Sequence, residues 1–250
     1  MAFLRLRGLI RRRILVNFRA APDVIQKVLP QPFHPKLLGD WAMAGICLIR
    51  LERIRPAFVP IPIGLSSENA AHRIAVRWTD EEGRPREGVY IPRRDSGSRI
   101  NHWVGGRLFP GEHHLADFDV REHDGRVDFS MRSRDGKILV FLKGQSDREL
   151  PETSRFASLE EASGFFEKGA LGYSETEAGD RLDGLYLVTK RWRIDPLKVD
   201  HAHSSYFENR DLFPQGSVEF DCALLMRDIE HEWYRAPDFH LSDRSATPSS

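Results

Sequence analysis

The stretch RILVNFRAAPDVIQKVLPQPF, from Arg13 to Phe33, decides the fold of this chain. It opens as an apolar run with strand-like alternation and passes through Ala-Ala-Pro into a short amphipathic segment. Pro22 suits the first turn of a helix, whereas Pro30 and Pro32 forbid its continuation. The apolar stripe of this helix consists of Val24, Ile25, Val28 and Leu29. The stretch therefore predicts a strand and then a short helix that lies across a sheet.

The remainder of the chain predicts mainly strands. We expect them at about residues 41–54, 66–79, 87–93, 113–122, 126–134, 137–143, 183–194 and 217–231. Asp124-Gly125 and Asp135-Gly136 favour tight primed turns, so the strands between residues 113 and 143 should form an antiparallel meander. Helices are expected over about 98–107 and 158–168. A capping box of Ser158 and Glu161 supports the second helix.

Two further segments complete a recognisable order: SSENAAHRIAVRW at 66–78 and GGRLFPGEHHLADFDV at 105–120. Together with residues 13–33 they resemble the acetoacetate decarboxylase-like superfamily, and more closely its uncharacterised branch, the DUF2071 or YqjF-like proteins. The resemblance covers roughly residues 11–145. It implies an α+β, mainly β fold: a bent antiparallel sheet, partly closed into a barrel or cone, with a few outer helices. A cavity inside the sheet should face the start of the 113–122 strand.

The lysine that the family uses to form a Schiff base is not found at the matching position of this chain. Acetoacetate decarboxylases carry a Schiff-base lysine beside a second lysine in a Tyr-Pro-Lys-Lys segment. The matching segment here is Leu108-Phe109-Pro110-Gly111-Glu112, so the lysine positions fall on Gly111 and Glu112. We therefore expect no imine chemistry from this segment. A substitute lysine from another strand, such as Lys143 or Lys190, has no motif to support it.

The resemblance also implies charged groups in the cavity. Glu68, in Ser66-Ser67-Glu68-Asn69, matches a Thr-Glu-Ser motif whose glutamate lines the pocket, which would make Glu68 a catalytic acid. Arg11, which has the family's spacing to a later arginine, or its neighbour Arg13 would hold the substrate carboxylate through two parallel hydrogen bonds. The alternatives are a salt-bridged or solvated carboxylate for Glu68, and a solvated basic arm for the arginines.

The segment Gly111-Glu112-His113-His114 supplies the remaining candidates. Gly111 could let the backbone approach a ligand, and Glu112 or a histidine could act as a base or hydrogen-bond donor. Neighbouring side chains of a strand face opposite sides, so we expect only one of the two histidines to enter the cavity. A polar start to an ordinary strand is the alternative interpretation.

The sequence contains no motif that supports a metal site, a nucleotide site or a serine nucleophile. His201-Ala202-His203 could share a strand face and ligate one ion, but no HExxH, facial-triad or CxxC pattern fixes such a site, and the segment could equally be a loop. Phosphate-loop, dinucleotide and GxSxG signatures are absent from the sequence. We therefore expect no metal and no cofactor.

Composition sets the remaining limits. With 250 residues, 40% hydrophobic and 30% charged, the chain is expected to form one domain over 1–241 with a disordered tail at 242–250. A formal net charge of zero gives no reason to expect nucleic acid or an anionic membrane, and no run of about 18 apolar residues would span a membrane. Cys47 and Cys222 lie in apolar surroundings, which favours buried, reduced thiols and a cytoplasmic location.

Two functional hypotheses follow. The first is a cavity that binds a small organic acid or carbonyl compound, with an N-terminal arginine on the anion and Glu68 or Glu112 exchanging protons in lyase-like chemistry without an imine. The second is a non-catalytic ligand-binding or scaffold protein that keeps the fold. Exposed strand edges would permit a homo-oligomer.

Overall fold

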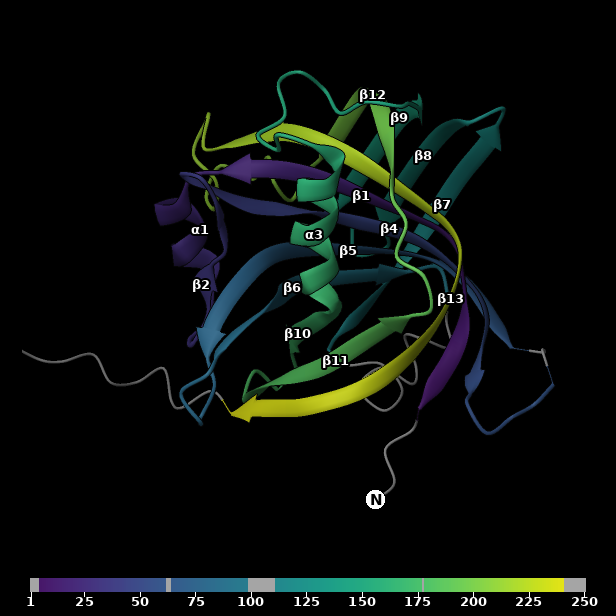
Figure 1. Cartoon of the computed structure of the whole chain (residues 1–250), viewed down its shortest axis with the longest axis horizontal. Helices are drawn as coiled ribbons and strands as arrows, with labels where there is room; N and C mark the ends of the chain where they lie inside the picture. The colour runs from purple at the N-terminus through teal and green to yellow at the C-terminus, as the bar shows by residue number, and fades with distance from the viewer. Residues whose placement is uncertain (1–4, 62–63, 99–110, 177, 241–250) are drawn as a thin grey trace, which may run out of the picture.

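The computed structural model describes residues 5–61, 64–98, 111–176 and 178–240. The described part is mostly strand (Figure 1). The strands are β1 (Leu6–Ala20), β2 (His34–Pro35), β3 (Leu37–Leu38), β4 (Trp41–Pro56), β5 (Leu65–Thr79), β6 (Pro85–Ser96), β7 (His113–His123), β8 (Arg126–Ser133), β9 (Leu139–Ser146), β10 (Leu171–Glu175), β11 (Arg181–Thr189), β12 (Asp195–Ser204) and β13 (Val218–His240). The helices are α1 (Pro22–Val28), α3 (Leu159–Glu167) and the 3-10 turn η1 (Lys168–Ala170).

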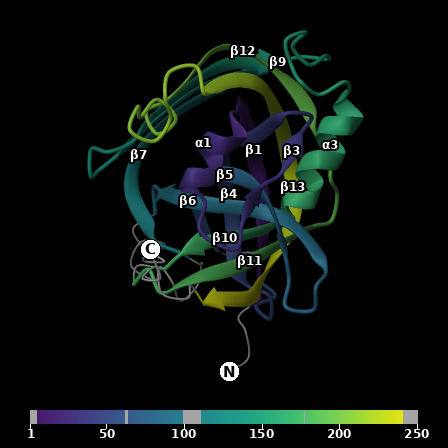
Figure 2. The same ribbon diagram turned by 90° about the vertical axis from the view of Figure 1, so that its left-hand side faces the viewer.

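All strands belong to one strongly curved sheet. Its order is β11-β10-β6-β7-β8-β9-β12-β13-β1-β4-β5-β2, and β3 pairs with β4. Two additional pairings, β11–β13 and β6–β5, join strands that are far apart in this order. The sheet therefore closes two rings of hydrogen-bonded strands, and both rings contain β13, β1, β4, β5 and β6 (Figures 1 and 2).

The shared strands are buried on both faces. One face packs with β8 and β9 around Ile14, Phe129 and Leu142. The other face packs with α3 around Leu15, Cys47 and Phe166. Since each face of β1 and β4 has its own core, these strands have long apolar runs instead of a simple alternation of apolar and polar residues.

The opening stretch folds as predicted, into a strand and a short helix. Pro22 begins α1, which buries Val24 and Ile25, and the chain then turns so that Phe33 is completely buried. The ring of Phe33 contacts four other aromatic rings. They belong to Trp78, Tyr90, Tyr173 and Phe239, with centroids 5.2 to 6.1 Å away. The segment after α1 thus closes one end of the core.

The meander and the capped helix are also present. Asp124 and Gly125 both have positive φ, 47° and 77°, as a primed hairpin turn requires. At α3 the Ser158 hydroxyl accepts the Glu161 amide, and the Glu161 carboxylate accepts the Ala157 amide.

Several features differ from the sequence prediction. Strand β6 pairs in parallel with both β7 and β10, so the sheet is not purely antiparallel. Strands β2, β3, β10 and β12 were not predicted, and His201 and His203 lie in β12. The strand expected at 183–194 ends at Thr189. The helix expected at 98–107 and the tail at 242–250 fall outside the described residues, apart from residue 98. Parallel pairs join segments that are distant in sequence, so no local turn signal announces them.

In the part of the chain that the structure describes, none of the helices has the length and apolar character needed to cross a membrane.

Candidate functional site

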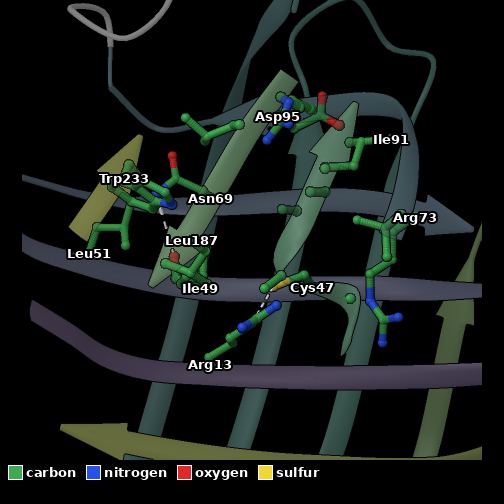
Figure 3. Close-up of a pocket in the computed structure, with 18 of the residues that line it drawn as sticks. Arg13, Cys47, Ile49, Leu51, Asn69, Arg73, Ile91, Asp95, Leu187 and Trp233 are labelled. Carbon is green, nitrogen blue, oxygen red and sulfur yellow. Dashed lines mark hydrogen bonds between the residues drawn. The ribbon is translucent and has the colours of Figure 1, made fainter. Parts of the chain in front are cut away.

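A cavity of about 130 Å³ lies on the face of the shared strands that packs with α3. Figure 3 shows side chains that line it. Its floor consists of β1, β4, β5 and β6, and its cover comes from η1, β10 and β11 together with Trp233 of β13. Most of its wall is apolar, including Ile49, Leu51, Val89, Ile91, Leu185 and Leu187. This volume is well below that of drug-sized pockets, so the cavity suits a ligand of few atoms.

Arg13 enters the cavity from β1. Its Nε donates to Cys47 Sγ at 3.2 Å, and its buried Nη1 has no hydrogen-bond partner among the described residues (Figure 3). Cys47 lies in the adjacent strand β4, so both groups belong to the floor.

Arg73 and Arg94 bring two more guanidinium groups to the same cavity. Arg73 donates to the Asn17 side-chain oxygen, and Arg94 donates from Nε to Ser174 Oγ at 3.0 Å. Burial lowers the pKa of each arginine from 12.5 to about 10, and the charge of Cys47 opposes this shift. Both groups therefore remain cationic at neutral pH, at an energetic cost to the folded protein.

No carboxylate neutralises these three arginines within the described residues. None of them forms an ion pair there, and Arg73 Nε and Arg94 Nη2 are buried without a hydrogen-bond partner in that part of the chain. Buried charges are normally paired, so the cavity presents an excess of positive charge that an anionic ligand would satisfy.

One acid, Asp95, also lines the cavity, but it already has a partner. Arg93 Nη2 lies 2.9 Å from Asp95 Oδ1 and the same distance from Asp135 Oδ2. Burial raises the pKa of the Asp95 carboxyl, and the hydrogen bond from Arg93 opposes this. Asp95 therefore already forms an ion pair with Arg93.

The segment 111–114 reaches the cavity through one side chain. His113 lines it, whereas His114 lies near Glu112 and Asp135, at 3.6 and 3.7 Å. Glu112 is largely exposed and does not line the cavity.

Gly111 does not line the cavity, but it packs against Ser174, whose hydroxyl accepts from Arg94. Its φ is +79°, and a Cβ there would approach Ser174 Cβ to 2.5 Å. A lysine at this position would be strained in backbone and would collide with β10.

Arg11 and Glu68 lie away from this cavity. Arg11 pairs with Glu52 and Asp228 at 3.0 and 2.6 Å. The registers of β1 with both β4 and β13 skip Arg11. This bulge puts Arg13 on the cavity face, while the substrate-binding role of Arg11 has no support from the geometry.

Glu68 belongs to an ion-pair cluster on the opposite face of the sheet. Its Oε2 accepts from Arg12 Nη2 at 2.5 Å, and Arg12 also pairs with Glu122 at the same distance. Arg12 lies over the ring of Phe129, which belongs to the other core. Burial raises the pKa of Glu68, and the charge of Arg12 opposes this shift. The catalytic role of Glu68 stays a prediction.

That role can be tested by Glu68→Gln. Because Glu68 and the cavity lie on opposite faces, we expect the affinity for a small carboxylate to stay within about twofold of the wild type. The unfolding free energy should fall by about 1 kcal/mol, since one charge-assisted hydrogen bond becomes neutral. Calorimetric titration and urea unfolding measure the two quantities. A tenfold loss of affinity would show that Glu68 does take part in ligand binding.

The sequence interpretation missed Arg73, Arg94 and Cys47. A signal for Arg73 was present, since an arginine inside the apolar run of β5 needs a buried role. Arg94 carried a weaker signal, because Arg93-Arg94-Asp95 reads as an ordinary charged strand end.

His231 adds a pH-sensitive contact beside the cavity. It is buried, its ring lies 4.2 Å from that of Trp233, and burial lowers its pKa to about 4. A folded pKa below the unfolded value of about 6.5 means that the unfolded chain binds the proton more tightly, so stability is lost as pH falls from about 6.5 to 4.

We expect His231→Leu to reduce the slope of unfolding free energy against pH in this window. The reduction should approach about 1.4 kcal/mol per pH unit, which is the contribution of one titrating group. Urea unfolding at several pH values provides the measurement, and Leu keeps the site apolar. His72, whose pKa burial lowers to about 3, retains its own contribution in both proteins. An unchanged slope would show that His231 is already protonated in the folded state.

Comparison with known proteins agrees with this architecture. The DUF2071 family model, an uncharacterized conserved protein, matches residues 9–226. Among curated proteins, none matches the chain.

Solved structures share the fold at low identity. Acetoacetate decarboxylase from Legionella pneumophila is 13% identical with a TM-score of 0.59, covering 96% of this chain and 88% of that one. An acetoacetate decarboxylase-like enzyme from Sphingomonas wittichii RW1 is 11% identical with a TM-score of 0.59, covering 97% and 94%. The enduracididine biosynthesis enzyme MppR, complexed with pyruvate, is 12% identical with a TM-score of 0.56, covering 97% and 91%. The predicted fold is thereby confirmed.

Proposed function

The chain belongs to the DUF2071 family, and we propose that its cavity binds a small organic acid through buried arginines, without forming an imine. One observation carries this proposal: Arg13, Arg73 and Arg94 line a single small cavity, and no carboxylate pairs with them among the described residues. A carboxylate ligand would supply the missing charge and accept hydrogen bonds from the free N–H groups. The structural relative MppR, which was solved with pyruvate, supports a ligand of this size.

The positions of the lysines support the proposal that no imine forms. The chain has seven lysines, all within the described residues: Lys27, Lys36, Lys137, Lys143, Lys168, Lys190 and Lys198. None of them lines the cavity. Lys143 and Lys190 pair with exposed acids, Asp128 and Glu230. Lys36 lines a smaller pocket beside the cavity together with Arg13 and Arg73, but its ammonium group pairs with Glu87 at 2.7 Å. We therefore expect a carbonyl ligand in the cavity to meet no lysine amine.

Two acids and one histidine are available for proton transfer in this proposal. Asp95 and His113 line the cavity, whereas Glu112 is next to His113 in sequence. Lyase-like acid–base chemistry would use the lining pair in preference to Glu112 or Glu68. A non-catalytic binder has the same arginines, so only turnover separates the two classes.

The test compares carboxylates with neutral analogues of the same shape. We expect pyruvate and acetoacetate to raise the melting temperature of the purified protein, and pyruvamide to leave it unchanged. Equal shifts with pyruvate and pyruvamide, or no shift with any acid, would refute the proposal. Product assays on the acids that bind then separate an enzyme from a binder.

Borohydride treatment in the presence of the same acids tests the imine separately. We expect no mass increase on any lysine. A lysine adduct seen by peptide mass spectrometry would show that an amine reaches the ligand after all.

A further inference from the structure

Cys47 lies in the floor of the arginine cavity, in contact with Arg13. Its sulfur accepts the Arg13 Nε hydrogen bond at 3.2 Å and faces the cavity (Figure 3). Its cross-strand neighbour on β5 is Ala71, a small side chain that leaves space beside the sulfur. The thiol forms no disulfide and is buried, and it lines the cavity through which a small reagent would approach it.

The sulfur shares its cavity with three arginines. Besides Arg13, which contacts it, Arg73 and Arg94 line the same cavity. Arg73 is only 4% exposed, lines the cavity, and has a buried Nε without a hydrogen-bond partner among the described residues. This orphaned donor favours an anionic ligand in the cavity independently of the cysteine. Thiolates, the nucleophilic form of cysteine, are favoured beside guanidinium groups.

Arg13 holds the sulfur, and the cavity arginines offer donors to a ligand. Arg13 Nε is used by Cys47, and Arg13 Nη1, on the opposite edge of the same guanidinium, is buried without a hydrogen-bond partner in the described part of the chain. Arg73 Nε and Arg94 Nη2 are orphaned in the same way. Because the cavity measures only about 130 Å³, a carboxylate bound to these donors keeps its neighbouring carbon in the same small space as Sγ, and such closeness is what proximity catalysis requires.

We propose that Cys47 is a carboxylate-directed nucleophile that reacts with small acids whose electrophilic carbon is next to the carboxylate. This inference rests on the proposed function for the binding of the carboxylate. With a 2-oxo acid, the thiolate forms an S–C bond to the carbonyl carbon, the C=O π electrons move to oxygen, and the oxygen takes a proton from water. With a 2-halo acid, the S–C bond forms as the carbon–halogen bond breaks and halide leaves.

Iodoacetate and iodoacetamide provide matched probes, since they differ mainly in charge. Ordinary thiols show no preference for the acid, but at Cys47 we expect alkylation by iodoacetate to be at least about tenfold faster than by iodoacetamide, because only the acid is held by the arginines. Peptide mass spectrometry over time measures the rate at each cysteine. Pyruvate should slow the reaction of iodoacetate at Cys47 by competition.

The second cysteine is an internal control. Cys222 is completely buried, does not line the cavity, and has a pKa raised to about 12 by burial and the nearby charge of Asp221. It should stay unmodified by both reagents. The variant Arg13→Met should abolish the preference for iodoacetate at Cys47, while Arg121→Met, at an exposed position, should preserve it.

The outcomes separate this inference from the binding proposal. If pyruvate raises the melting temperature but Cys47 reacts no faster with iodoacetate than with iodoacetamide, the nucleophile is refuted and the binding site stands. If Cys47 is inert to both reagents in folded protein, the nucleophile is likewise refuted. A preference for iodoacetate that survives Arg13→Met would also overturn it, since Arg13 would not direct the acid.

Discussion

Arg94→Met is expected to weaken binding of a small carboxylate by about 100-fold or more. Arg94 is a cavity arginine whose Nη2 has no hydrogen-bond partner within the described residues. Charge-assisted contacts to a buried anion contribute about 2–5 kcal/mol, and about 2.7 kcal/mol corresponds to 100-fold in affinity. Met keeps much of the apolar stem of the side chain but removes every donor. Calorimetric titration with pyruvate, or with whichever acid gives the largest thermal shift, measures the effect.

Loss of stability should not accompany this loss of affinity. Burial lowers the pKa of Arg94 to about 10, so its charged form disfavours the folded state at neutral pH. Replacing an uncompensated buried cation by an apolar group is often neutral or stabilising. We therefore expect the ligand-free variant to melt at or above the wild-type temperature. The matched control is Arg121→Met, where an exposed arginine pairs with Asp119 and affinity should be unchanged. Equal affinities of the Arg94 variant and the wild type would remove Arg94 from the site.

Phe33→Ala is expected to lower the unfolding free energy by about 3–5 kcal/mol, the range for buried aromatic truncations. Phe33 is 0% exposed and contacts the rings of Trp78, Tyr90, Tyr173 and Phe239. Truncation removes its apolar surface and leaves a cavity that rigid neighbouring rings fill poorly. Urea unfolding monitored by tryptophan fluorescence gives the value.

The matched control for this truncation is Phe58→Ala. Phe58 is 79% exposed, so the same substitution should change the unfolding free energy by no more than about 0.5 kcal/mol. Similar losses for both variants would mean that the ring contacts of Phe33 do not stabilise the fold. A loss at Phe33 below about 1 kcal/mol would contradict the packing argument directly.

Local signals explain what the sequence could predict. Pro22 and the later prolines fixed α1, and Asp124-Gly125 fixed a hairpin, because these residues restrict the backbone within a few positions. Arg13 was among the candidates because the resemblance implies an arginine just ahead of the first strand, in the cavity. The resemblance supplied the closed sheet that such local signals do not specify.

Long-range geometry explains what the sequence could not predict. Which N-terminal arginine faces the cavity depends on a bulge in β1 between Ile10 and Arg12. A single extra residue inverts every later side chain, so Arg13 instead of Arg12 shares the face of Ile10. Arg94 joins the site because the register of the β5–β6 hairpin places it opposite Ala71. The closeness of Arg13, Arg73 and Arg94 is therefore a property of register, which composition and local spacing do not encode.

The pairing of β1 with β13 has a consequence for biosynthesis. Leu6 lies opposite Trp233 and Ala20 opposite Val218. One edge of β1 therefore stays unpaired until β13, the last strand of the described chain, has been synthesised. Until the ribosome has released β13, a long apolar edge of β1 has no partner and can pair with another nascent chain. Products that stop before residue 218 would lack this strand, and we expect them to aggregate or be degraded.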